Sequence, residues 1–485
     1  MNGLFVSHPV IKYQLLLIGL LVVSLFSRLY NINYNSPFND EAIYQVIGNL
    51  GVFKWDWVSY NAPAWVAGSI FVYPTFSALA GSLGGVLGAR ILNVIFGVLA
   101  LESIFNLGSL LPDARGRANY VAGLLSALIL GGASVTYYVS RLATYDMPSF
   151  YFLLLGLYFL SRAWRVGSNS SRWYFFSALT LTLAVLTKMI VGLYIVPIWI
   201  LSFLVSWQRG VFNLALWRNY FLLPQLALLG IYVVFSYGPL LTYAQIQSAR
   251  EYIAWPQILQ FFWSQTKWAF GWWVLGTIGL ALKRKWGLWA VLTGLALLPL
   301  AFHLGTHRMV TLDKHVFLSI AFLALVAGIG LSYLLSFPSR VFRLILGAFL
   351  TLTFGFYLYS SFNEASHYNS RWINTYSATN YLRSQVSPTD KILAEAGAAV
   401  ILATYPITPP ANVTTFDWLE FKGTTGKDAY ESAVLNGHFN YIQLFNDPKQ
   451  SGQANGNLQT VVKENLYGYK LAYFDSDFSI YKRLY

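Results

Sequence analysis

Residues 316–336 read VFLSIAFLALVAGIGLSYLLS, a run that contains no charged side chain. A helix needs about 20 mostly apolar residues to cross the hydrocarbon core of a membrane, and this run has that length. Similar runs occur before and after it, so we predict a polytopic α-helical membrane protein with about 11 spans. The predicted spans are 11–27, 90–111, 119–136, 147–164, 173–187, 189–206, 219–237, 267–282, 286–302, 316–336 and 342–360.

The composition indicates the same class of protein. Of the 485 residues, 56% are hydrophobic and 11% are charged, whereas ordinary soluble domains have about 25% charged residues. The 17 Trp and 33 Tyr residues suit a membrane–water interface. The chain has no cysteine, which excludes disulfides and cysteine-based metal or nucleophile sites.

The positive charge is distributed as expected for a membrane protein. The net charge of +13 comes largely from Lys and Arg in short loops between apolar runs, which favours topology control over a nucleic-acid partner. With a cytoplasmic N-terminus and a retained first helix, these loops, including Lys283-Arg284-Lys285, are cytoplasmic and the C-terminus is outside. The apolar stretch 62–88 is rich in Gly and Pro, and we expect it at the interface or re-entrant. These patterns predict an integral protein of the inner or plasma membrane.

A change of composition near Asn363 divides a membrane domain, 1–362, from a soluble non-cytoplasmic domain, 363–485. The second part contains turn signals, among them Pro409-Pro410. A helix is expected around Ala378–Gln385, and the runs KILAEA, YIQLF, YKLAYF and FSIYKRLY have the composition of strands. We therefore predict a small α/β or α+β domain.

Three acidic residues in predicted outer segments are candidates for chemistry. Asp40 and Glu41 follow the first span, and a carboxylate beside a low-dielectric wall suits a general base. The pair is also compatible with an ordinary solvated loop. Asp146 lies at the outer start of the fourth span, where it either faces the same cavity or caps the helix, with Pro148 in the first turn.

Basic residues supply the second set of candidates. Lys188 lies between two apolar runs, where an ionisable group suggests a phosphate-binding role, although snorkelling at the interface is the alternative. A late outer loop contains His303, His307, Arg308, Asp313, Lys314 and His315. Its cations suit a lipid phosphate. The spacing of His303 and His307 also leaves a divalent metal possible, so no cofactor is certain.

These pieces, in this order, resemble membrane glycosyltransferases of the GT-C superfamily. The nearest resemblance is to the branch with dolichyl-phosphate-mannose protein mannosyltransferases and the aminoarabinose transferase of lipid A. The motifs that carry it are Asp40-Glu41 after the first span, Ala89-Arg90-Ile91, Arg141 followed by Asp146, Thr187-Lys188, and the basic loop from Arg308 to His315.

The resemblance implies an inverting transfer of a sugar from a polyprenyl-phosphate donor to an acceptor hydroxyl at the outer face of the membrane. The acceptor is a lipid, glycan or protein. Asp40 is expected to be the base, with Glu41 and Asp146 positioning it or the acceptor. The residues implied to bind the donor phosphate are Lys188, Arg308, Lys314, His315, Arg90 and Arg141.

Two other functions remain open at this stage. Intramembrane charges also mark transport paths, so a transporter or lipid flippase is the first alternative. The sequence has no internal repeat of the kind that many transporters show. A non-catalytic assembly or receptor protein is the second alternative, and it would tolerate the loss of Asp40.

Overall fold

The computed structural model describes residues 9–57, 60, 66–110, 118–166, 170–208, 214–248, 252–368, 371–416, 419–447, 449 and 452–484. Contacts between Cα atoms divide the chain into two compact units. The first consists of Met1–Ile32, Val66–Tyr73 and Arg90–Tyr368, and the second of Asn33–Trp65, Pro74–Ala89 and Asn369–Tyr485. The second unit therefore combines the C-terminal region with two segments from the first hundred residues.

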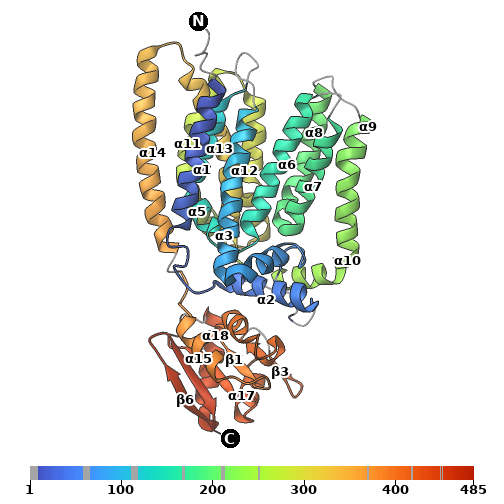
Figure 1. Ribbon diagram of the computed structural model, residues 1–485, viewed down its shortest axis with the longest axis vertical. Coiled ribbons are helices and arrows are strands. Elements are labelled where there is room, and N and C mark those ends of the chain that lie inside the picture. Colours follow the sequence, from blue (N-terminus) through green and yellow to red (C-terminus); the bar gives the residue numbers. More distant parts are fainter. Residues whose placement is uncertain are drawn as a thin grey trace. The chain divides into compact units, whose positions relative to one another are not determined.

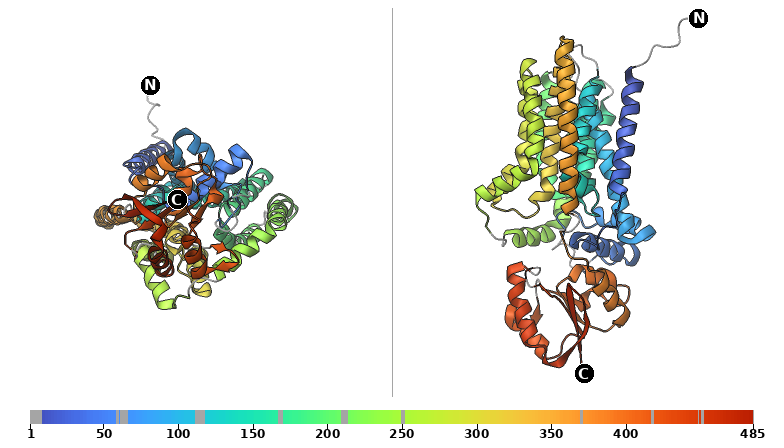
Figure 2. Two further views of the ribbon diagram at one scale, coloured as in Figure 1. Left: turned by 90° about the horizontal axis from the view of Figure 1, so that it is seen from below. Right: turned by 90° about the vertical axis from the view of Figure 1, so that its left-hand side faces the viewer.

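The first unit is built from long helices that run side by side (Figures 1 and 2). Its helices are α1 (Pro9–Leu29), α3 (Tyr73–Ser109), α4 (Tyr120–Gly131), α5 (Ser134–Ser140), α6 (Asp146–Val166), α7 (Ser171–Thr187), η3 (Met189–Tyr194), α8 (Ile195–Gln208), α9 (Leu214–Trp217), η4 (Arg218–Leu222), α10 (Leu223–Ser248), α11 (Trp255–Leu282), α12 (Trp286–Thr306), α13 (Leu312–Leu335) and α14 (Arg340–Tyr368). Part of α3, Pro74–Ala89, is assigned to the second unit.

The protein is an integral membrane protein, as predicted. Within the described ranges, 6 helices are long and apolar enough to cross a membrane, or up to 7 if α4 and α5, bent by 72°, form one span. Each predicted span falls mainly on helix, but a count of eleven is not confirmed. The stretch 62–88 contains the start of α3, whose helical geometry breaks at Gly84 and Gly85.

Helix α13 forms the centre of the first unit, because nearly all of its side chains are buried. Glycines bring its backbone against that of α11. A Cβ added at Gly279 would collide with the carbonyl oxygen of Gly330, and a Cβ at Gly330 would collide with that of Gly276. Small residues at such a crossing let two membrane helices approach closely and pack.

The second unit contains a five-stranded sheet. Its elements are α2 (Asn39–Lys54), α15 (Tyr376–Gln385), β1 (Ile392–Ala394), α16 (Gly397–Thr404), η5 (Pro410–Asn412), β2 (Val413–Thr415), β3 (Glu420–Phe421), β4 (Thr424–Thr425), α17 (Gly426–Leu435), β5 (Tyr441–Phe445), α18 (Gly452–Glu464), η7 (Leu466–Gly468), β6 (Tyr469–Phe474) and β7 (Phe478–Arg483). The strand order is β2-β1-β5-β7-β6. β1 pairs in parallel with β2 and β5, and β7 is antiparallel to β5 and β6.

Apolar side chains fill both faces of this sheet, since neighbouring residues of a strand point to opposite sides. Ile392 lies in a core with residues of α15 and α16. Leu393 and Ile442 lie in a second core with residues of α17 and α18. The prediction of a small α/β domain is confirmed. The strands predicted from YIQLF and YKLAYF coincide with β5 and β6.

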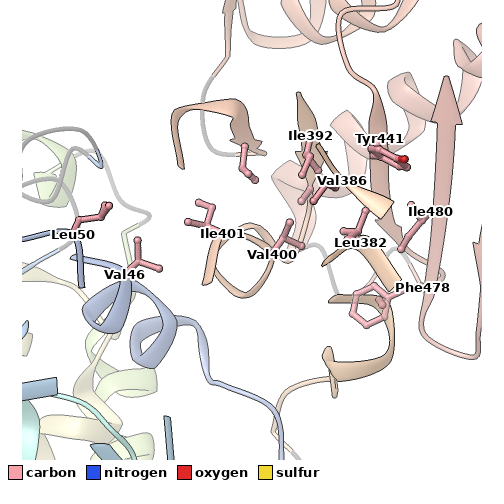
Figure 3. Close-up of a cluster of buried hydrophobic side chains, with 13 residues drawn as sticks. Val46, Leu50, Leu382, Val386, Ile392, Val400, Ile401, Tyr441, Phe478 and Ile480 are labelled. Carbon is pink, nitrogen blue, oxygen red and sulfur yellow. The ribbon is translucent and has the colours of Figure 1, made fainter. Parts of the chain in front are cut away.

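Helix α2 belongs to the core of the second unit (Figure 3). Val46 and Leu50, one helical turn apart, share a buried cluster with Val400 and Ile401 of α16. The loop that follows the first span is thus part of the same body as the C-terminal sheet. The predicted boundary between 1–362 and 363–485 falls inside α14 and stays a prediction.

Candidate functional site

A buried ion pair lies in the first unit. Lys188 Nζ donates to Asp146 Oδ1, although the two residues are 42 positions apart in the sequence. Both side chains are almost completely buried. Lys188 also makes a cation–π contact with the ring of Tyr145, with Nζ 5.2 Å from the ring centroid. A charge pair inside a protein is stable only if its members are paired and hydrogen-bonded, which these contacts achieve.

Hydrogen bonds hold Asp146 at the first position of α6. Thr144 Oγ1 donates to Asp146 Oδ2 at 2.6 Å, and Ser149 Oγ donates to the Asp146 carbonyl at 2.8 Å. The buried amide of Asn93 donates to the carbonyls of Leu142 and Thr144. Asn93 therefore ties the turn before α6 to α3. The carboxylate of Asp146 is directed to Lys188 and Thr144.

Lys188 projects from a break between two helices. It follows the last residue of α7 in an extended conformation, with φ −150° and ψ 117°. The break is hydrogen-bonded to residues 67–69, where the chain bends: Ser69 N donates to Leu186 O at 2.6 Å, and Met189 N donates to Ala67 O at 2.8 Å. Gly68 lies between these bonds, and a Cβ there would meet the carbonyl of Thr187. The close backbone approach thus requires glycine and fixes the direction of Lys188.

Two histidines form a hydrogen-bonded pair where α12 ends and α13 begins. His303 Nδ1 lies 2.7 Å from the Arg308 carbonyl, which can only accept, so this nitrogen is the donor. His303 Nε2 lies 2.8 Å from His315 Nδ1. If both rings are neutral, His315 donates from Nδ1 and carries its lone pair on Nε2.

Lys314 completes the set that we call the cation cluster: Lys188, Lys314, His303 and His315. Lys314 is 6% exposed. It lies near enough to Asp146 and Lys188 for a charge–charge interaction with each of them. The ammonium group of Lys188 also interacts electrostatically with the rings of His303 and His315. Four separate segments of the chain thus gather two ammonium groups, two imidazole rings and the carboxylate of Asp146 in a water-poor place, and Asp313 also interacts electrostatically with Lys188 and His303. The two ammonium groups favour a bound anion, because low dielectric enhances charge interactions, and the carboxylates offset part of their charge.

Two predicted phosphate ligands have other contacts. Arg90 donates to the carbonyl of Ile32 at 3.2 Å. Arg141 donates to the carbonyls of Tyr30 and Asn31 at 2.9 and 2.8 Å. Both guanidinium groups are buried and bind backbone carbonyls just beyond the end of α1. These contacts support a role in fixing the exit of the first span.

Asp40 and Glu41 belong to the second unit, at the start of α2. Glu41 is fully buried, and its Oε2 accepts from the backbone N–H of Phe38 at 2.8 Å. This bond satisfies a donor ahead of the helix, as in the second half of a capping box. Asp40 is only half-buried. The neighbouring carboxylates therefore have different surroundings.

Sequence reasoning missed Asn93 and Thr144 in these arrangements, but it named His303. Asn93 and Thr144 are ordinary polar residues with no pattern around them that predicts their contacts. His303 had a signal, because three of the six His residues fall between 303 and 315. Among the described residues, no group of three or more His, Asp or Glu side chains is arranged to hold a metal ion.

Comparison with known proteins shows which folds this architecture is similar to. A family model described as dolichyl-phosphate-mannose-protein mannosyltransferase matches residues 68–237. The structure of ArnT from Cupriavidus metallidurans bound to undecaprenyl phosphate is 13% identical, covering 97% of this chain and 98% of that chain with a TM-score of 0.64. The chain has the GT-C fold. A comparison with curated proteins gave no match.

Two further structures share this fold. The arabinofuranosyltransferase AftD from Mycobacteria is 14% identical, with 96% of this chain and 40% of that chain covered and a TM-score of 0.60. The oligosaccharyltransferase AglB from Archaeoglobus fulgidus, in complex with an inhibitory peptide and a dolichol-phosphate, is 10% identical, with coverage of 96% and 74% and a TM-score of 0.54. The predicted resemblance to GT-C enzymes is confirmed at the level of the fold.

Proposed function

We propose that the protein is an inverting glycosyltransferase that moves a sugar from a polyprenyl-phosphate donor to an acceptor hydroxyl. The reaction takes place at the outer face of the membrane, with the N-terminus in the cytoplasm. The single observation that carries the proposal is the buried cation cluster with its partner Asp146. A cluster of this kind costs folding stability, and a lipid phosphate explains why the cations are gathered there.

The phosphate is the leaving group of this reaction. As the bond between the anomeric carbon and the phosphate oxygen breaks, negative charge grows on the phosphate. Lys188 and Lys314 stabilise that charge, and because they are already in place they need no reorganisation during the step. In its protonated form, His315 donates from Nε2 to a phosphate oxygen as well, because its Nδ1 already donates to His303. Asp146 holds Lys188 in position and does not itself touch the reacting atoms.

The acceptor hydroxyl requires a base, and Asp40 is assigned to that role. A hydroxyl attacks the anomeric carbon opposite to the departing phosphate, which inverts the configuration. Asp40 takes the hydroxyl proton as the new bond forms. Glu41 positions it by fixing the first turn of α2. The half-buried carboxylate of Asp40 and the fully buried carboxylate of Glu41 support this division.

The test is release of polyprenyl phosphate by the purified protein. Detergent-solubilised protein is mixed with a labelled polyprenyl-phosphate sugar, with and without a panel of acceptors that covers lipids, glycans and peptides. We expect release that depends on acceptor and is lost in the double variant Lys188→Met with Asp146→Asn, which leaves no unpaired buried charge. Absence of release with every sugar and acceptor, together with movement of the intact lipid between leaflets of a vesicle, would contradict the proposal and favour a flippase.

A further inference from the structure

The second unit contains a cavity of about 360 Å³. Its lining includes Glu395 after β1, Thr415 and Phe416 at the end of β2, and Phe445 at the end of β5. All of these residues lie at the carboxyl ends of the parallel strands. From β1 the chain passes through α16 to β2 and returns through α17 to β5 on the other side of β1. Ligands of open α/β sheets bind at such a reversal, outside the carboxyl ends.

One polar group in the cavity wall has no protein partner. Thr375 is 7% exposed, and its hydroxyl makes no hydrogen bond within the described part of the chain. Thr375 precedes α15, where a threonine hydroxyl would normally accept from the helix backbone, yet it makes no such capping bond. Buried hydroxyls in native proteins nearly always have a partner. The oxygen is covered in the unliganded protein, and a rotation of the Thr375 side chain would present it to a ligand in the cavity.

The wall around Thr375 is firmly held. Ser36 Oγ accepts from Thr375 N at 2.9 Å, and Trp372 Nε1 donates to the Ser36 carbonyl at 2.9 Å. Phe38 packs against the Trp372 ring at 5.2 Å between centroids. Hydrogen bonds and an aromatic contact thus connect the segment that leads into α2 with the segment that leads into α15. The cavity wall is preformed, which reduces the cost of ordering on binding.

The lining has one basic and one acidic side chain, Arg371 and Glu395, whose charges balance, so it suits a neutral ligand with many hydroxyls. The lining contains aromatic rings, of which Trp372 and Phe416 are two, and groups that bind hydroxyls, among them Thr375 and Glu395. Glu395 Oε2 accepts from Phe445 N and from Gln459 Nε2 at 2.8 Å, so a carboxylate is fixed just before α16. Because Glu395 offsets the charge of Arg371, the lining offers a phosphate no net attraction. A sugar ring offers both an apolar face of C–H groups and a rim of hydroxyls.

We propose that this cavity binds one neutral sugar ring, and that the ring belongs to the acceptor of the transfer reaction; only the second statement rests on the function proposed above. The volume lies at the lower end of the range for small-molecule sites and suits one ring. Asn39 and Ile43 of α2 also line the cavity. The helix that carries Asp40 is therefore part of the sugar-binding wall.

The sugar site is tested on the full-length protein without donor. Ligand-observed NMR would measure binding of mannose, glucose, galactose, arabinose and N-acetylglucosamine, each with inorganic phosphate as a competitor. We expect at least one sugar to bind and phosphate not to displace it. Thr375→Val, which removes only the hydroxyl, should weaken binding about tenfold. Ala399→Leu, which fills the cavity, should abolish it.

The control is Thr404→Val, on α16, because Thr404 is buried but does not line the cavity. It should bind sugar as the unchanged protein does. Unfolding midpoints verify that each variant is folded, and Thr375→Val remains informative if Ala399→Leu does not fold. If no sugar binds, if phosphate displaces it, or if neither substitution alters its affinity, the sugar site is refuted.

Acceptor use is a separate measurement. With the sugar that binds offered as a glycoside acceptor, Ala399→Leu should lose transfer to it but still bind polyprenyl phosphate. Transfer that persists would show that the ring in the cavity is not the acceptor. Sugar binding without any release of polyprenyl phosphate in the unchanged protein would refute the proposed function and leave the sugar site standing.

Discussion

The ammonium group of Lys188 and the carboxylate of Asp146 form a buried pair across 42 residues of sequence. Each charge is buried at a cost that only its partner offsets. The backbone pairing of residues 67–69 with 186–189 directs Lys188 to this place, and Thr144 holds the other oxygen of Asp146. Separate contacts therefore position each member of the pair. Substitutions can distinguish the contribution of the pair to stability from its proposed role in binding phosphate.

Lys188→Met should destabilise the protein by about 3–5 kcal/mol, because it leaves the carboxylate of Asp146 buried without its partner. The double variant Lys188→Met with Asp146→Asn should recover most of this loss, since no unpaired charge remains. Polyprenyl phosphate binding should stay weak in both variants. Chemical unfolding in detergent and a lipid-binding titration measure the two properties. Binding restored in the double variant would show that Lys188 is structural only.

Asp40→Asn should lower the transfer rate by about 10²–10⁴-fold, because Asn cannot accept a proton. Donor binding and the unfolding midpoint should remain unchanged. Glu41→Gln is the matched variant: it weakens the bond to Phe38 N and should cost about 1 kcal/mol of stability with a smaller loss of rate. Transfer rates of Asp40→Asn and Glu41→Gln, measured at saturating donor, distinguish the roles of the two carboxylates. Turnover retained in Asp40→Asn would refute Asp40 as the base, whereas a loss in Asp146→Asn would not identify the base, because that substitution also removes the partner of Lys188.

The crossing of α11 and α13 should be sensitive to a single methyl group. Gly330→Ala should destabilise the protein by about 1–3 kcal/mol, because the new Cβ collides with the carbonyl of Gly276. Gly271→Ala on α11 is the control, since no atom lies within 4 Å of its added Cβ. It should be neutral or stabilising by up to about 1 kcal/mol. Equal unfolding midpoints for the two variants would contradict this account of the crossing.

Single cysteines introduced into this cysteine-free chain test the orientation. Lys427 is exposed in the second unit, and Lys283 is exposed after α11. In intact cells an impermeant thiol reagent should label Lys427→Cys, whereas Lys283→Cys should react only after the membrane is opened. The expectation follows from the concentration of Lys and Arg in cytoplasmic loops. The reverse labelling would show that the topology is the opposite of the one predicted. It would also contradict a reaction at the outer face of the membrane.

Much of the architecture was predictable because it rests on local patterns. The run 316–336, which has no charged residue, indicated a spanning helix, and YIQLF has the composition of a strand. Helix α16 was not predicted, because its short apolar run, GAAVILAT, fits a buried strand equally well. The 3-residue strand β2 is too short for any alternation to be recognised.

The candidate site was predictable only in its parts. Lys188 and Asp146 were recognisable as costly charges, but nothing local indicates that one is the partner of the other. The role of Gly68 depends on a segment more than a hundred residues away. The cavity of the second unit was also out of reach, because its wall combines residues near 40 with residues beyond 370. Contacts distant in sequence have no local signature.

The shared core of Val46 and Leu50 with Val400 and Ile401 has a consequence for modularity. The second unit is not one contiguous segment of the chain, because one of its helices lies more than 300 residues upstream of its sheet. A chimaera that exchanged only the C-terminal region between two proteins of this fold would set a foreign α16 against the native α2. Recombination in nature or in the laboratory would therefore have to exchange both segments together to keep Asp40 on a supported helix.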